Sequence, residues 1–354
     1  MAPDTSGPAG APGTPLESPV PAARRRAGLA RLASWDTVVV AVLVLTVMIA
    51  AGTIDGFGTA RNFNFLILDV AAIALIAMPM TLVIITGEID LSVASALGLT
   101  SSVMGQLWVA GFPLETIAIL CVLLGALLGA VNGAFTTRFG LPSLAVTIGT
   151  LALYRGLAYV VLGDRAVADF PVTWTRAVTS TLPGIPLPTM IVPLLAFAAV
   201  FGIVLHATPV GRSLYAIGAN AESARFAGIA VARTKFWLFV ATGAMSGLAG
   251  VYWALRYASA RADVAAGLEL SVVAAVLLGG VSIFGGRGTL PGVMAGVLLL
   301  GTLINALRLA NVSAEALNIV TGLLLIISVV TPNVIVLARR ALARRAPAAS
   351  VEVP

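Results

Sequence analysis

Two carboxylates stand in an otherwise apolar part of the sequence. Glu88 and Asp90 lie between two long apolar runs, and Ser92 follows them. An ionisable group near the hydrocarbon of a membrane is costly, so its presence indicates a transport pathway or a structural pairing. For Asp90 we favour the structural role, because its carboxylate could accept hydrogen bonds from the backbone that opens the next helix. The alternative is that both groups lie in the wet cytoplasmic interface.

A glycine-rich stretch is the second candidate. Residues 279–288 read Gly-Gly-Val-Ser-Ile-Phe-Gly-Gly-Arg-Gly, which disfavours a continuous helix. Irregular backbone at membrane depth is tolerated only where it lines a cavity or is buried in protein. The stretch therefore predicts a broken helix beside a translocation path. A phosphate cradle is less favoured, because the lysine and the following Ser or Thr of a phosphate-binding loop are missing. The candidate path residues here are Gly279, Gly280, Ser282, Gly285 and Gly286.

A polar, basic segment over residues 209–235 separates two further apolar runs. Residues 221–226 are good helix formers, with Asn220 placed as an N-cap and Gly228 as a stop. Ala224, Ala227 and Gly228 put small groups on one side of this short helix, where a partner could approach closely. A capped helix on the basic side of a membrane favours binding of a cytoplasmic partner. The alternative is a solvated loop with one helical turn.

The elements that must position these residues are membrane helices. Of the 354 residues, 59% are hydrophobic and 10% are charged. A soluble core could not absorb that apolar fraction and leave a polar surface. The apolar segments are about 20 residues long, which is the length needed to cross ~30 Å of hydrocarbon. The composition predicts an all-α polytopic membrane protein, surrounded by lipid. The net charge of +6 reports orientation and not nucleic-acid binding, because the arginines are scattered at helix ends.

Several function classes are excluded by what the sequence lacks. Lys235 is the only lysine and follows Ala-Arg-Thr, so the chain has no phosphate-binding loop and is not itself such an ATPase. His206, the only histidine, is expected at a membrane interface, and Cys121 lies in an apolar run. We therefore expect no disulfide, no metal site, no cofactor and no nucleophile–base pair for catalysis.

The pattern predicts about ten spans in a transmembrane domain over residues 35–337, flanked by a disordered cytoplasmic tail at 1–34 and a cytoplasmic tail at 338–354. With ten spans, both termini lie on the side that holds 14 Arg and Lys, against 6 on the other side. Because positive charge is retained in the cytoplasm, both termini are expected there. The expected spans are 35–54, 63–86, 91–109, 114–135, one ending at 162, 189–206, 236–255, 270–283, 290–307 and 316–336.

A weak internal echo accompanies this topology. Residues 129–132, which end at Asn132, and the turn to Gly149 resemble residues 301–305, which end at Asn305, and the turn to Gly322. One copy turns inside and the other outside, which is the arrangement of an inverted repeat in transporters. Chance similarity between apolar segments is the alternative.

Several ordered motifs together resemble those of ribose-type monosaccharide permeases of ATP-binding cassette (ABC) importers. Residues 86–93 resemble the Thr-Gly-Gly-Ile-Asp-Leu-Ser-Val signature of that family, with Glu88 in place of the usual glycine. The likeness covers roughly residues 60–335 and not the tails. Further matching blocks are 141–150 with 154–156, 211–220 with 227–229 (the family's coupling loop), and 278–282 with 285–288 (its glycine-rich break).

The resemblance implies a transport subunit that pairs with a second copy or a sister permease. ATP hydrolysis would belong to a separate cytoplasmic ABC ATPase, and an external binding protein would deliver a pentose, a rhamnose-like deoxyhexose or an autoinducer-2-like furanose. The implied ATPase-coupling residues are Gly211, Arg212, Tyr215, Gly218, Asn220, Ala224 and Gly228.

The alternative from another class is an ion-coupled secondary transporter, with Asp69, Glu88 and Asp90 as ion carriers. We disfavour this interpretation because such a transporter needs no cytoplasmic docking helix.

Overall fold

The computed structural model describes the backbone of residues 35–345 and the side chains of residues 35–330, so the expected tail at 1–34 and most of the one at 338–354 lie outside it. The described chain is helical, with only two isolated β-bridges. Its helices are α2 (Trp35–Thr53), α3 (Ala60–Ile85), α4 (Val93–Val109), α5 (Leu114–Arg138), α6 (Ser143–Leu162), α7 (Val172–Thr179), α8 (Ile191–Ala207), α9 (Pro209–Ala219), α10 (Ala221–Phe226), α11 (Val231–Arg256), α12 (Leu268–Leu278), α13 (Leu290–Leu309) and α14 (Ala314–Arg345).

An all-α polytopic membrane protein is what this architecture supports. Among the described residues, six helices are long and apolar enough to cross a membrane, namely α2, α3, α5, α6, α11 and α13. The pair α8 and α9, bent by 68°, makes a seventh candidate. The apolar helices α4, α12 and residues 314–330 of α14 are shorter. Each expected span coincides with an apolar helix, but length and composition alone support six or seven crossings, not ten.

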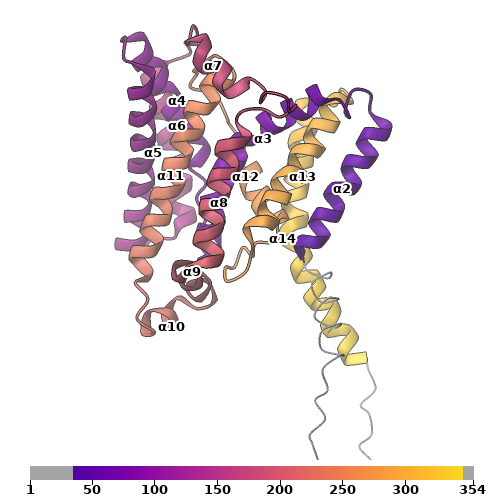
Figure 1. Cartoon of the computed structure of the whole chain (residues 1–354). Helices are drawn as coiled ribbons and strands as arrows, with labels where there is room; N and C mark the ends of the chain where they lie inside the picture. Colours follow the sequence, from indigo (N-terminus) through magenta and orange to yellow (C-terminus); the bar gives the residue numbers. More distant parts are fainter. Residues whose placement is uncertain (1–34, 346–354) are drawn as a thin grey trace, which may run out of the picture.

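Helix α3 forms the centre of the bundle (Figure 1). Nearly all of its residues from 66 to 85 are buried, as expected of a helix that is apolar on every side. The helix continues through Pro79. Helix α2 differs, because only Val39 and Ala50 are buried along it. Its apolar side chains project away from the protein, which is the arrangement that a lipid environment favours.

Helices α5 and α11 cross at very close range. Glycines face each other there, so a Cβ atom on Gly129 would collide with the Phe239 carbonyl, and one on Gly243 would collide with the Gly125 carbonyl. Small residues at a crossing let two membrane helices approach closely and gain van der Waals contact. The high glycine content of the sequence is explained in part by this packing.

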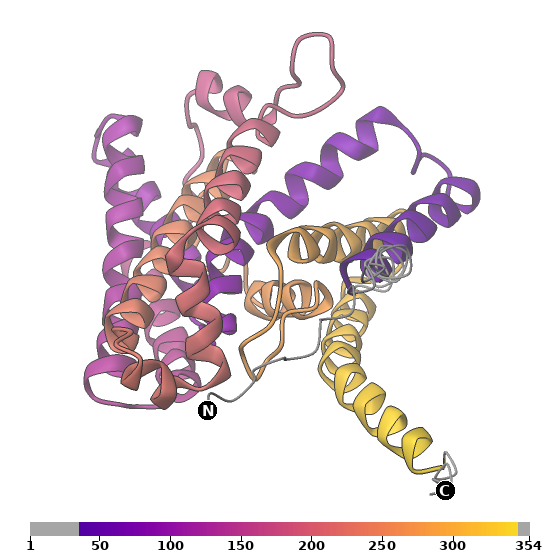
Figure 2. The same cartoon turned by 60° about the horizontal axis from the view of Figure 1, so that its bottom comes forward.

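The two ends of the bundle carry different short helices. Figure 1 shows α9 and α10 together at the lower end and α7 at the upper end. We call these the α10 end and the α7 end. Helix α10 has the bounds expected from the sequence, whereas α9 was not anticipated. Figure 2, which brings the lower end forward, shows the loop between α12 and α13 next to α9.

Two helix ends differ from expectation for clear reasons. Helix α12 ends at Leu278 and not near 283, because Gly279 and Gly280 follow directly. Helix α14 continues to Arg345, past the expected end at 336. Residues 337–345 are rich in Ala, Leu and Arg, which are strong helix formers, and the next proline after Pro332 is Pro347.

Candidate functional site

The first cluster of interest surrounds Asp90, just before α4. Asp90 is 1% exposed, and its Oδ1 accepts hydrogen bonds from the Ser92 backbone N–H at 2.9 Å and from the Ser92 hydroxyl at 2.7 Å. The Asn132 amide of α5 donates to the Ser92 hydroxyl at 2.7 Å and lies 3.5 Å from Asp90 Oδ1. Burial raises the pKa of the Asp90 carboxyl, while these hydrogen bonds act to lower it.

Tyr154 extends this cluster to α6. Its hydroxyl lies 3.3 Å from Asn132 Oδ1 and donates to the Leu128 carbonyl at 2.9 Å. None of the four ion pairs found among the described residues includes Asp90. The carboxylate is therefore stabilised by neutral hydrogen-bond donors. Through its two hydrogen bonds to Ser92 it fixes the backbone turn that leads into α4. The sequence analysis did not identify Asn132 and Tyr154 as members of the Asp90 cluster. Asn132 could have been noticed, because an asparagine within an apolar helix needs a polar partner.

Glu88 lies two residues away but has a different partner. Its carboxylate forms an ion pair with Lys235, at the start of α11, and both side chains are mostly buried. The only lysine of the chain is thus matched to the acid that departs from the family signature. The backbone between the two acids is also held, because Ser143 accepts from the Ile89 N–H at 3.2 Å.

The glycine-rich loop between α12 and α13 is a compact turn, as the sequence predicted for this break. The Ser282 N–H donates to the Arg287 carbonyl at 3.0 Å, and the Gly285 N–H donates to the Ser282 carbonyl at 2.9 Å. Gly286 has φ +73°, which favours glycine, and its N–H donates to the Ile85 carbonyl at the end of α3 at 2.8 Å. The loop is therefore attached to the central helix.

Helix α9 is attached to the same loop. The Tyr215 hydroxyl donates to the Gly288 carbonyl at 2.7 Å. A Cβ atom on Gly218 would collide with the Ile85 carbonyl and with the Gly286 backbone. Gly211 is similarly pressed against the Leu205 carbonyl. These three coupling-loop residues contact other parts of the chain, whereas Arg212 is exposed.

Helix α10 is capped as the sequence predicted, because Asn220 Oδ1 accepts from the Ser223 N–H at 2.7 Å and Gly228 follows with φ +84°. The expectation that Ala224 offers a free small face is wrong. Ala224 is buried against Ile217 of α9 and Val231 of α11.

The reason is steric, since a helix this short must bury one side on its neighbours and alanine fits the narrow gap. The exposed side of α10 instead carries Phe226, which is 86% exposed, with Glu222 and Arg225.

Helix α2 also reaches this end of the bundle. Trp35 Nε1 donates to the Leu278 carbonyl at 3.0 Å, and its ring occupies the space next to Gly280. Asp36 accepts from the Thr289 hydroxyl at 2.8 Å. His206, expected as an interfacial group, accepts through Nε2 from the N–H of residue 290 at 3.2 Å and so caps α13. None of these contacts was evident from the sequence.

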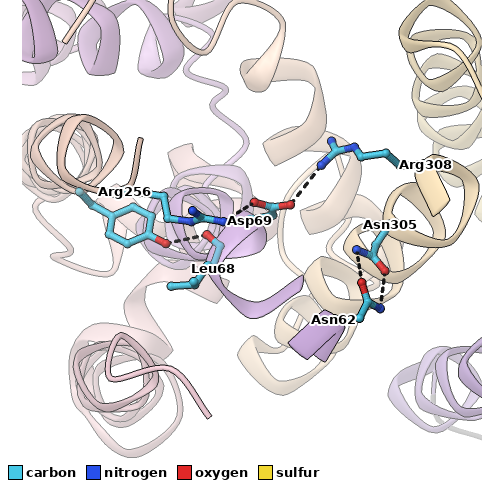
Figure 3. A network of polar contacts seen from close by, with 7 residues as sticks. Asn62, Leu68, Asp69, Arg256, Asn305 and Arg308 are labelled. Carbon is cyan, nitrogen blue, oxygen red and sulfur yellow. Dashed lines mark hydrogen bonds and ion pairs between the residues drawn. The ribbon is translucent and has the colours of Figure 1, made fainter. Parts of the chain in front are cut away.

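A second polar cluster lies at the α7 end (Figure 3). Asp69 of α3 is joined to Arg256 at 3.4 Å and to Arg308 at 3.1 Å. Beside it, Asn62 and Asn305 exchange side-chain hydrogen bonds of 2.9 and 3.1 Å. Sequence reasoning singled out only Asp69 and Asn305 of these five. Over the residues with described side chains, no group of three His, Cys, Asp or Glu could hold a metal ion.

Taken together, a helical membrane bundle, a broken helix and a capped helix that is joined to the break through α9 define a membrane transport protein. Residues 62–329 match the family described as the permease component of the branched-chain amino acid transport system. The chain belongs to this family and is a multi-pass protein of the bacterial inner membrane.

The chain is also similar in sequence to individual proteins of known name. The chain is 33% identical over 309 residues to the autoinducer 2 import system permease protein LsrD of Photorhabdus luminescens, covering 84% of this chain and 90% of the relative. It is 32% identical over 307 residues to LsrD of Yersinia enterocolitica, covering 84% and 91%. LsrD of Yersinia pseudotuberculosis is also 32% identical, over 313 residues, 85% of this chain and 92% of the relative. No solved structure matches the chain.

Proposed function

We propose that this chain is the permease subunit of an ABC importer that carries a monosaccharide delivered by an external binding protein. The observation that carries the proposal is a continuous line of contacts from exposed α10 to the broken helix. Helix α10 packs on α9 through Ala224, and α9 holds the glycine-rich loop through Tyr215 and Gly218. A displacement of α10 by an ATPase would therefore reach the break directly.

This line of contacts is suited to alternating access. A packed core is bistable and does not deform continuously, so small shifts at one site are amplified where an element has two arrangements. The loop is held at Ile85 and Gly288 by single hydrogen bonds, which can exchange at low cost. We assign the path to the residues around this loop and to the neighbouring turn with Glu88, Asp90 and Ser92.

For the topology we propose ten spans with both termini in the cytoplasm. The three shorter apolar helices would complete the count, with α12 and the glycine-rich loop acting as one broken span. An inverted repeat is supported by the two buried asparagines, because Asn132 and Asn305 each bond to a residue at the start of another helix, Ser92 and Asn62, at opposite ends of the bundle. The basic α10 end would then be cytoplasmic.

The proposed partners follow from this topology. A cytoplasmic ABC ATPase would bind the α10 end, a sugar-binding protein would bind the opposite end, and a second copy or a sister permease would complete the pore. The similarity to autoinducer 2 import permeases keeps a furanose among the candidate substrates, beside pentoses and deoxyhexoses. Ion coupling is less favoured, because Asp69 and Glu88 are both paired with basic side chains, while the third candidate carrier, Asp90, is bonded to Ser92 and lies 3.5 Å from the Asn132 amide.

The direct test reconstitutes the chain with a candidate ABC ATPase and a candidate sugar-binding protein from the same organism. In sealed vesicles we expect uptake of a labelled monosaccharide that needs ATP and the binding protein. Uptake driven by a proton or sodium gradient without ATP would contradict the proposal.

A second test examines the exposed aromatic of α10. Aromatic anchors dominate many interfaces, so Phe226→Ser should reduce sugar-stimulated ATP hydrolysis about tenfold or more. The control is Leu127→Ser, an exposed apolar residue within α5 and away from both ends of the bundle, which should leave hydrolysis unchanged. Equal loss in both variants, with equal amounts in the membrane, would mean that the ATPase does not dock on α10.

A further inference from the structure

A pocket of about 260 Å³ opens at the α7 end, outside the elements assigned to coupling. It lies where α11 and α13 end and where α12 and α14 begin, with α3 as its inner wall. Asp69 contributes to the lining from nine residues inside α3, which corresponds to a depth of ~13 Å along that helix. The pocket therefore leads from the outer end of the bundle toward its central helix.

The lining combines aromatic faces with polar side chains. Trp253 and Tyr257 of the α11 end stand together, with ring centroids 5.0 Å apart. Ser271 of α12 and Asn318 of α14 also line the pocket, and among the described residues neither side chain has a hydrogen-bond partner. Arg308 uses Nη1 to bond Asp69, and with its side chain 61% exposed its remaining donors are open to a ligand or to water. Five helices thus bring uncommitted donors and acceptors to one space.

The Asp69 carboxylate can accept hydrogen bonds beyond those from its two arginine partners. Its two oxygens are oriented by Arg256 and Arg308, and its side chain remains 28% exposed. A carboxylate offers about four lone-pair sites, so two arginine contacts leave acceptor capacity for hydroxyl groups. The arginines also offset its charge, so the pocket is not strongly repulsive to a neutral or weakly polar ligand.

We propose that this pocket is a binding site for a single monosaccharide ring, occupied between release from the binding protein and passage through the bundle. The proposal rests on the proposed import function and adds a substrate site within one subunit. Apolar ring faces of a sugar would pack on Trp253 or Tyr257, while its hydroxyls bond Asp69, Ser271, Arg308 and Asn318. The volume is just below the ~300–1,000 Å³ of ordinary ligand pockets, which suits one ring and not a disaccharide.

The test measures sugar binding by the full-length chain in lipid nanodiscs, without the binding protein. The probes are D-ribose, D-xylose and L-rhamnose, each by calorimetry and by saturation-transfer NMR, with glycerol as an open-chain polyol. We expect at least one ring sugar to bind and glycerol to bind about tenfold more weakly. Asn318→Leu and Ser271→Ala should each weaken that sugar about fivefold, as expected for one lost hydrogen bond.

The matched control is Gln106→Leu, an exposed amide on α4 that does not line the pocket. This variant should bind as the unaltered chain does, and the thermal midpoints of all variants verify that they are folded. Absence of binding by all three sugars, or equal affinity in Asn318→Leu and in Gln106→Leu, would overturn the pocket.

Uptake by the complete complex, measured in parallel, separates this proposal from the proposed function. Sugar uptake together with unaltered affinity in the two pocket variants would reject the pocket and leave the importer in place. Binding in the pocket without any ATP-dependent uptake would support the pocket and reject the proposed import function.

Discussion

The two polar clusters at opposite ends of α3 are built from similar residues but in different surroundings. At the α10 end, Asp90 is fully enclosed and bonded to Ser92 and Asn132. At the α7 end, Asp69 is partly exposed and bonded to two arginines. An acid that lacks a basic partner must satisfy its charge with neutral donors, whereas an acid between two arginines keeps capacity for a ligand. An aspartate therefore fixes the backbone before α4 at one end of the bundle, and at the other end it lines a solvent-accessible pocket.

The comparison also concerns free energy. Breaking the contacts of a buried charged group costs far more than breaking a partly exposed ion pair, since each orphaned buried donor loses its partner without gaining water. Substitutions at the two ends should therefore differ in stability, in an order set by burial and not by the charge that is removed.

The largest effect is expected for Asp90→Ala. The change leaves the Ser92 N–H and the Ser92 hydroxyl without their acceptor and removes the weaker of the two acceptors of the Asn132 amide, at a cost of about 3 kcal/mol or more. We expect loss of uptake together with loss of folded protein, measured as the thermal midpoint in detergent and as the amount in the membrane. Asp69→Ala is the comparison variant and should lower the midpoint much less. Equal destabilisation would remove the distinction between the two clusters.

An intermediate effect is expected for substitution of the two buried asparagines Asn132 and Asn305, one from each cluster. Asn132→Leu removes a donor from the Asp90 cluster and should cost about 2 kcal/mol. Asn305→Leu should cost about 1 kcal/mol, because Asn62 keeps a hydrogen bond to the Phe57 carbonyl. Both positions are buried and the substitution is the same, so denaturation midpoints in one detergent compare them directly. A larger loss in Asn305→Leu would show that the α7 end is the more tightly held.

The smallest effect is expected for Glu88→Gly, which restores the residue that the family signature carries. Lys235 loses its partner, but a lysine at a helix start can extend its ammonium group toward water. Sugar uptake should remain within about twofold of the unaltered chain at matched membrane levels, because the freed ammonium group can reach water and the substitution restores the residue of the family signature. A loss of uptake equal to that of Asp90→Ala would place Glu88 in the path.

Local patterns predicted much of the fold. The apolar runs located the long helices, the Asn220 cap and the Gly228 stop gave the bounds of α10, and Gly279 with Gly280 marked the break. These features are written in neighbouring residues, so they can be inferred without knowing the packing.

The contacts that build the clusters could not be predicted in this way. Lys235 meets Glu88 across 147 positions, and Tyr215 meets the glycine-rich loop across 73. The burial of Ala224 is of the same kind, because it depends on how α9 and α11 pack around a short helix. Small side chains on one face are compatible both with a free surface and with a tight internal contact, and only the packing decides between them.

The attachment of α2 has a consequence for the order in which the chain is built. Trp35 bonds a carbonyl that lies 243 residues later, so α2 must wait in the membrane until α12 has been synthesised. At about 5–20 residues per second the wait is roughly 10–50 s. Its mean hydropathy of 2.1 lets the helix rest alone in lipid during that time. Helix α2, the first of the described helices to be made, is therefore among the last to be docked, and the glycine-rich break is not enclosed until it arrives.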